Sequence, residues 1–233
     1  MRLRTSIFGH LWIAAIVVAL GSSAQAINIS LNYAHGSFFD TRPVAKAAVD
    51  AAAADLSAAI TTSLNAVTSA QDTVTGSYLD TTAELNWRYR YDNPYTGATV
   101  EVDPTSIGAN TVSVAVGARK LGGETLGQGG AGGVGINWYL SGYPSQLGGA
   151  VDDAEAQSNA IHPRGGGPTI GSLTGNLSLG PASTSYSLTY GINFGHLWFD
   201  IDTDNDGYTD SDTELTNHWH YDHTTPVAWN KYD

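Results

Sequence analysis

The sequence predicts a mixed α/β (α+β) domain in which a long Ala-rich helix packs against β-strands and long Gly-rich loops join the elements. Several short segments alternate apolar and polar residues, whereas one Ala-rich segment repeats its apolar residues at three- and four-residue steps. A chain of 233 residues with 42% hydrophobic content can bury one sizeable core. We therefore expect a single domain over residues 27–233.

The composition favours metal cations as partners. Lys and Arg total 10 against 22 Asp and Glu, so nucleic acid and anionic membrane surfaces are poor partners for this chain. There is no Cys, which excludes disulfides, thiolate zinc sites and a cysteine nucleophile. We expect metal ions as ligands, with peptides or proteins as further partners.

Residues 1–26 have the pattern of a signal peptide. Arg2 and Arg4 form a basic start, the apolar run IFGHLWIAAIVVAL follows, and the small residues of AQA mark cleavage after Ala26. The alternative is an uncleaved membrane anchor, although the apolar run is short for a full span. The sequence therefore predicts a secreted or periplasmic protein with no membrane contact after cleavage, in a compartment where calcium is plentiful.

A strand and a helix are expected first. In INISLNY, residues 27–33, apolar residues alternate as in a half-buried strand. A helix should begin at Pro43, which suits a first turn, with Asp40 or Thr41 as its cap. Its recurring apolar positions are expected to pack into the core: Val49, Ala52, Leu56, Ile60 and Leu64.

Two further strands follow. In ELNWRYRY, residues 84–91, Leu and aromatic residues alternate with Asn and Arg, which predicts a strand with a charged outer face. In TVSVAVGA, residues 111–118, three valines share one face of a strand.

The middle of the chain is rich in Gly and predicts long loops. LGGETLGQGGAGGVG, residues 121–135, lacks the Gly-Lys-Ser/Thr end of a phosphate-binding loop and is too rich in Gly for a regular element. Residues 141–180 continue in this way, with HPRGGGP at 162–168 as a surface turn. Regular structure should return in YSLTYGINF, residues 186–194, as a strand that leads into an acidic segment.

The acidic segment DIDTDNDGYTDSDTE, residues 200–214, carries seven carboxylates and no Lys or Arg. It contains the pattern D-x-D-x-D-G, in which alternate carboxylates converge on one calcium ion and Gly permits the sharp turn. Thr213 stands where an EF-hand needs a bidentate Glu, so we predict a calcium loop of another kind; the alternative is a solvated acidic turn. The candidate ligands are Asp202, Asp204, Asp206, the Tyr208 carbonyl and Asp210.

A cluster of histidines follows in NHWHYDH, residues 217–223. If this segment is extended, His218 and His220 share a face, and His223 can fold back to complete a zinc site with Asp222. The alternative is a polar strand end whose histidines only form hydrogen bonds. Zinc is therefore a second predicted metal.

Together these features resemble the secreted matrixin-like branch of the metzincin zinc peptidases. The resemblance rests on the order strand, Ala-rich helix, two strands, the Gly-rich stretch GARKLGGETLGQGG, and then FDIDTDNDG and HWHYD. It implies a zincin-like fold, a twisted mixed β-sheet backed by helices, with calcium and zinc sites in loops before the active-site helix. The family's His-aromatic-Asp tripeptide matches His220, Tyr221 and Asp222, which would give His220 to zinc and Asp222 to calcium.

The catalytic signature of that family is missing. H-E-x-x-H places two zinc ligands one helical turn apart with Glu as the general base, but no two histidines of this chain are four residues apart. We therefore expect no catalytic residues, no peptide cleavage by this chain, and a domain truncated at its C-terminus before the active-site helix. Without that helix, we expect partial exposure of Leu85, Trp87 and the strand around residues 112–116.

Other enzyme classes find little support, because no G-x-S-x-G motif occurs and mutually repelling solvated carboxylates make poor acid/base pairs. A calcium-dependent extracellular binding or adhesion module is the alternative function. One long helix on a mixed sheet would favour the peptidase-like scaffold, whereas two stacked antiparallel sheets without that helix would favour the module.

Overall fold

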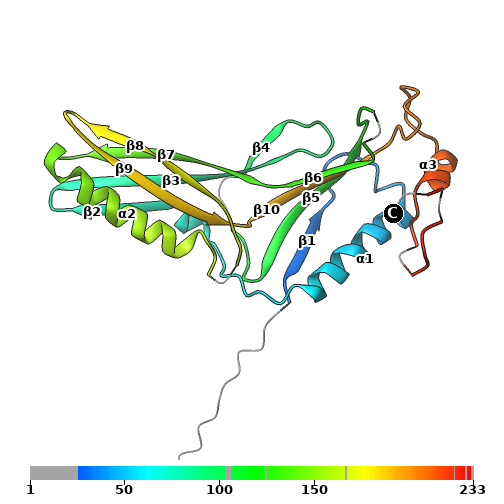
Figure 1. Cartoon of the computed structure of the whole chain (residues 1–233), viewed down its shortest axis with the longest axis horizontal. Coiled ribbons are helices and arrows are strands. Elements are labelled where there is room, and N and C mark those ends of the chain that lie inside the picture. The colour runs from blue at the N-terminus through cyan, green and yellow to red at the C-terminus, as the bar shows by residue number, and fades with distance from the viewer. Residues whose placement is uncertain are drawn as a thin grey trace, which may run out of the picture.

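The computed structural model describes residues 26–102, 106–123, 125–165, 167–222, 224–228 and 230–231. These residues form an α+β fold, which confirms the predicted class. The elements lie in two regions along the long axis of the molecule (Figure 1). One region holds a mixed sheet with a helix on it, and the other holds antiparallel strands with a second helix.

The elements in these described segments are as follows. The strands are β1 (Asn28–Asn32), β2 (Thr73–Tyr78), β3 (Thr81–Asp92), β4 (Thr99–Val102), β5 (Thr111–Arg119), β6 (Gly127–Ala131), β7 (Gly133–Ser141), β8 (Thr169–Leu179), β9 (Ala182–Gly191) and β10 (Phe194–Asp200). The helices are α1 (Pro43–Ala59), α2 (Leu147–Ile161) and α3 (Asp212–His218), with the short 3-10 turns η1 (Ser69–Gln71) and η2 (Pro144–Gln146).

The helix-backed sheet consists of β1, β5, β10 and β6, in that order across the sheet. β1 and β10 both run parallel to β5, and β6 runs antiparallel to β10 at the edge. Parallel neighbours need a long crossover, and the crossover from β1 to β5 contains α1, which packs against β1 (Figure 1). The strands predicted in residues 27–33 and 111–118 are confirmed as β1 and β5, and they pair with each other.

Helix α1 begins at Pro43, as predicted, but without the predicted cap. Its N-cap residue is Arg42, and no side chain forms a capping hydrogen bond. Asp40 and Thr41 therefore do not cap the helix. Pro suits the first turn because its ring already holds a helical φ and it has no N–H that needs a partner.

The predicted core stripe of α1 is mostly wrong. The helix buries Ala45 and Ala53, whose small side chains allow close approach to the sheet. Of the predicted stripe only Leu64, which lies beyond the helix, is fully buried. The remaining positions are half-buried or exposed: Val49, Ala52, Leu56 and Ile60.

The second region, the antiparallel wing, consists of β2, β3, β4, β7, the β8–β9 hairpin and α2. β3 pairs with β2, β4 and β7, which confirms the strand predicted in residues 84–91. The β8–β9 hairpin closes over its inner face, and Leu85, Trp87, Tyr89 and Leu188 form a core with at most 2% exposure. The expected exposure of Leu85 and Trp87 is therefore wrong.

The strand around residues 112–116 is also better covered than expected. Val112 is 5% exposed and Val116 is fully buried, whereas Val114 is half-buried. Helix α1, in contrast, leaves Val44 and Leu56 exposed, at 63% and 56%.

Two stretches predicted as loops form regular structure. Residues 121–135 contribute β6 and the start of β7, and residues 141–180 contain α2 and β8. Sheet hydrogen bonds use only backbone groups, so Gly can pair where its neighbours hold it in place. Close backbone contacts even require Gly at two positions here, because a Cβ at Gly132 would lie 2.7 Å from the Arg90 carbonyl oxygen and one at Gly142 would lie 2.5 Å from the Asp80 carbonyl oxygen.

The predicted surface turn at residues 162–168 is buried at its start. His162 and Arg164 are both 0% exposed. The Arg164 guanidinium donates hydrogen bonds of 2.8 to 2.9 Å to four backbone carbonyls, those of Asn65, Gly108, Thr111 and Ile192. This side chain therefore joins the end of α2 to segments that lead into β5 and β10.

The strand predicted in residues 186–194 is interrupted. β9 ends at Gly191 and β10 starts at Phe194, where the chain leaves the wing and enters the helix-backed sheet. β10 then delivers the chain into the acidic segment from a position between β5 and β6.

Candidate metal centre

The acidic loop starts where β10 ends, and backbone hydrogen bonds close it. The Asp210 N–H donates to the Ile201 carbonyl at 2.8 Å, and the Asn205 N–H donates to the Asp202 carbonyl at 3.1 Å. Asn205 and Gly207 both have positive φ, at 59° and 88°. Such a conformation suits Asn and Gly and lets the chain turn sharply. The local sequence therefore folds the D-x-D-x-D-G segment back on itself.

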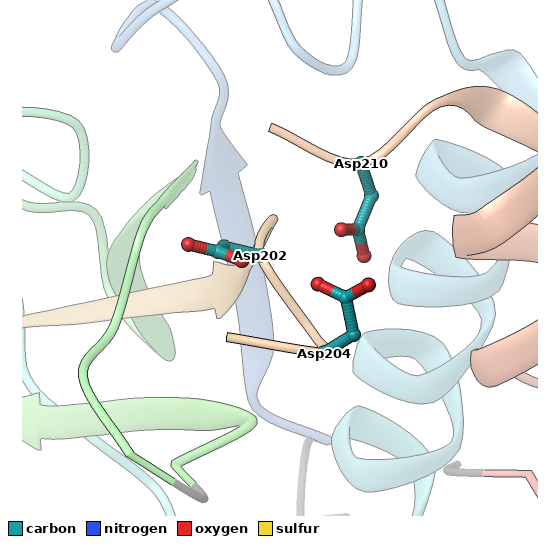
Figure 2. A group of neighbouring side chains, drawn as sticks. All are labelled: Asp202, Asp204 and Asp210. Atoms are coloured by element: carbon teal, nitrogen blue, oxygen red, sulfur yellow. The ribbon is translucent and has the colours of Figure 1, made fainter. Parts of the chain in front are cut away.

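Three of the predicted ligands come together in this loop. Asp202, Asp204 and Asp210 each offer a carboxylate oxygen, and these oxygens lie within 4.8 Å of one another. Figure 2 shows the carboxylates of Asp204 and Asp210 turned toward each other, with Asp202 beside them. Asp202 and Asp210 are only 6% and 5% exposed, whereas Asp204 is exposed.

Backbone and hydroxyl donors orient these carboxylates. The Gly207 N–H donates to Asp202 Oδ2 at 3.1 Å, and the Thr203 N–H donates to Asp210 Oδ2 at 3.0 Å. Asp202 Oδ1 is buried and accepts no hydrogen bond. Oxygen ligands held this way suit a hard divalent cation, which would also offset the repulsion between the three carboxylates.

Asp206 and Tyr208 occupy other positions in the loop. Asp206 does not belong to the close group, and its Oδ1 accepts a hydrogen bond from the Tyr208 N–H at 2.7 Å. The Tyr208 side chain is 76% exposed. The alternation of D-x-D-x-D therefore places two of its three Asp residues at the cluster, and the third stabilises the turn.

The predicted zinc ligands are not gathered in the described segments. His218 is the last residue of α3, so the segment is not extended there, and its Nδ1 contacts the Thr203 hydroxyl. His220 Nε2 lies 3.0 Å from the Thr225 carbonyl oxygen, which leaves the ring next to a turn. His223 lies outside the described residues. The close group found within the described ranges includes none of these histidines.

Asp222 is engaged by the turn that follows it. Its Oδ1 accepts hydrogen bonds from the Thr224 hydroxyl at 2.6 Å and from the Thr224 N–H at 3.0 Å. The hydrogen bond from the Thr224 side chain, followed by that from its backbone, holds the pKa of Asp222 below its ordinary value. Its carboxylate is therefore ionised at neutral pH.

The fold also forms an apolar groove that the sequence did not reveal, here called the α1 groove. It has a volume of about 350 Å³ and lies between one side of α1 and the helix-backed sheet. Leu56, at 56% exposed, lies on the helix side, and Leu31, Val114 and Phe199 lie on the sheet side. Trp219, His220 and Tyr221 also line it. Most of the α1 stripe predicted as core lines this groove.

None of the helices in the described part of the chain is long and apolar enough to cross a membrane. No protein-family model matches the chain, and no curated protein or solved structure shows significant similarity to it.

Proposed function

We propose that this chain is an exported metallopeptidase-like domain that binds a structural calcium ion in its acidic loop and has no peptidase activity of its own. The observation that carries the proposal is the cluster of Asp202, Asp204 and Asp210 at the end of a parallel strand. Two of these carboxylates are almost fully buried, which is costly unless a cation or hydrogen bonds compensate their charge.

The arrangement of the first region supports the peptidase-like scaffold over other hosts for a calcium loop. A single long helix, α1, packs on a mixed sheet, which is the arrangement that the resemblance to matrixin-like metzincins implies. In that family a further helix covers one face of the sheet. The α1 groove is an apolar surface beside this sheet that the described residues leave open.

Inactivity follows from the sequence. Zinc peptidases need ligands that lower the pKa of the attacking water and a base that takes up its proton. Neither the paired helical histidines nor the Glu of H-E-x-x-H is present. We also propose a zinc ion, with His218, His220, Asp222 and His223 as its ligands. Its support is the match of residues 220–222 to the His-aromatic-Asp tripeptide of that family.

The antiparallel wing favours a second candidate function. Its two layers of antiparallel strands are the architecture expected of a binding module. The outward side chains of the β8–β9 hairpin are Ser, Thr and Asn in cross-strand pairs such as Asn176 with Ser185. A calcium-dependent extracellular binding or adhesion module therefore remains the alternative, with the wing as its binding part.

Thermal melts with calcium and with chelator test the calcium proposal. At about 100 times its dissociation constant, calcium adds about 2.7 kcal/mol to the free energy of unfolding, which raises the Tm by about 5–10 °C. Asp204→Asn should clearly reduce this shift. Asp206→Asn removes the same charge from the same loop and should retain it. Equal shifts in both variants would contradict the proposed ligands.

A peptidase assay tests whether the chain is an active enzyme, which both candidate functions exclude. We expect the purified chain to leave a generic protein substrate intact with or without zinc. Hydrolysis that chelator abolishes, and that His220→Ala also abolishes, would show that the ligands have been assigned wrongly.

A further inference from the structure

Asp200, the last residue of β10, is a buried carboxylate that the calcium pattern did not include. It is 1% exposed. Its Oδ1 accepts hydrogen bonds from the Leu121 N–H at 2.8 Å and from the Asp202 N–H at 3.2 Å. Its Oδ2 is buried and accepts none. Two backbone N–H groups just outside the sheet therefore fix one oxygen of Asp200, and the other oxygen has no partner.

Asp202, two residues later, likewise has one carboxylate oxygen that accepts a hydrogen bond and one that does not. Its Oδ2 faces the acidic loop through the hydrogen bond from the Gly207 N–H, while its buried Oδ1 has no partner. The hydrogen bond between the Asp202 N–H and Asp200 Oδ1 places the Asp200 carboxylate against the Asp202 backbone. Two buried carboxylates, each with one unpartnered oxygen, thus adjoin at the end of β10.

No basic side chain in the described part of the chain neutralises this pair. The salt bridges there join Arg42 to Asp212, Lys46 to Asp50 and Arg88 to Glu101. The nearby Lys120 ammonium donates to the Gly207 carbonyl, and the Arg119 guanidinium lies over the Trp198 ring at 4.3 Å. Burying two adjacent carboxylates without a cation costs several kcal/mol per ion.

We infer that Asp200 Oδ2 and Asp202 Oδ1 bind a second calcium ion, separate from the one between Asp204 and Asp210. Asp200 does not belong to the group whose oxygens approach within 4.8 Å, so one ion held by Asp204 and Asp210 would not reach it. Asp202 then bridges two ions, with one oxygen toward each. This inference rests on the proposed calcium loop and extends it toward the core of the sheet.

The charges and chemistry agree with two ions. Calcium takes six to eight oxygen ligands, and carboxylates, backbone carbonyls and water all serve. Two calcium ions would balance the formal charge of the four carboxylates of Asp200, Asp202, Asp204 and Asp210. The second ion would join the end of β10 to the turn after β5, because Asp200 already holds the Leu121 N–H of that turn.

Native mass spectrometry and calorimetry with calcium test the stoichiometry. The wild-type chain should bind two ions, and Asp200→Asn and Asp204→Asn should each bind one. Asp206→Asn should still bind two, because its carboxylate belongs to neither site. If Asp200→Asn does not fold, the count for the wild-type chain and for Asp204→Asn decides between two sites and one.

Each other outcome overturns the inference in a recognisable way. One ion in the wild-type chain that persists in Asp200→Asn and disappears in Asp204→Asn would reject the second site and leave the proposed function standing. Two ions in Asp200→Asn would place the second ion elsewhere. No calcium binding by the wild-type chain would remove both the second site and the proposed calcium loop.

Discussion

Protonation of His162 should destabilise the fold in mild acid. His162 follows α2 and is 0% exposed, with its Nδ1 2.6 Å from the Tyr89 hydroxyl and its ring centroid 4.2 Å from that of Trp87. Burial lowers its pKa from 6.5 to about 4, because the imidazolium loses its hydration there, and the Gln71 backbone carbonyl opposes this only in part. The ring is therefore neutral in the folded protein at neutral pH.

The sign and size of the effect follow from linkage. The pKa of His162 is lower in the folded state than in the unfolded state, so the unfolded chain binds the proton more readily. The stability that His162 contributes is complete above about pH 6.5 and is lost as the pH falls from there through about 4. The loss is about 1.8 kcal/mol between about pH 7 and about pH 5, and about 3 kcal/mol by about pH 4. A domain with about 5–15 kcal/mol of total stability should show this clearly.

Urea unfolding of the wild-type chain and of His162→Asn, at about pH 7 and about pH 5, measures the effect. Asn retains an acceptor for the Tyr89 hydroxyl but does not titrate. The variant should be about 1–3 kcal/mol less stable near pH 7, because the ring packing on Trp87 is lost. Between the two pH values it should lose about 1.8 kcal/mol less than the wild-type chain.

His35→Asn is the matched control. His35 also contacts a tyrosine hydroxyl, that of Tyr91, but it is only half-buried. Its replacement should change the pH dependence less than that of His162. Equal losses of stability in the wild-type chain and in His162→Asn over this pH range would refute the assignment of the acid sensitivity to His162.

Two further predictions concern the core. Arg164→Met leaves four partly buried carbonyls without their donor, at up to about 1–3 kcal/mol each, so this variant should be far less stable than the wild-type chain. Arg164→Lys should keep part of the stability, and equal urea midpoints for the wild-type chain and Arg164→Met would contradict the role of the guanidinium. Leu64→Ala should lower the free energy of unfolding by about 2–5 kcal/mol, because Leu64 is 1% exposed. Leu56→Ala should lower it by less than about 1 kcal/mol, because Leu56 is 56% exposed. A lower Tm for Leu56→Ala than for Leu64→Ala would place the α1 stripe in the core.

Elements with a strong local pattern could be predicted from the sequence. The alternation in residues 84–91 and 111–118 identified β3 and β5 because each strand buries one face and alternate side chains meet it. Pro43 marked the start of α1 for a similarly local reason. The stripe of α2 was also present, since Leu147, Ala150, Val151, Ala154 and Ser158 are its buried residues, but the surrounding Gly and Pro hid it.

The Gly-rich strands could not be predicted, because their stability comes from partners distant in the chain. β6 pairs with β10, and β7 pairs with β3, through backbone groups that every residue type carries. The sequence of a Gly-rich strand therefore contains no signal that separates it from a loop. The same holds for Arg164, whose burial depends on carbonyls that lie 28 to 99 residues away.

By itself the sequence determined the acidic loop, because a D-x-D-x-D-G turn forms from the conformational preferences of its own Asp, Asn and Gly residues. Only the tertiary structure decided which carboxylates cluster there. Closure of the loop from Ile201 to Asp210 brings Asp210 beside Asp204 and leaves Asp206 outside, while pairing of β10 with β5 buries Asp200. Spacing along the chain sets where side chains can point, but the neighbours that bury a carboxylate come from strands and loops far away in the sequence.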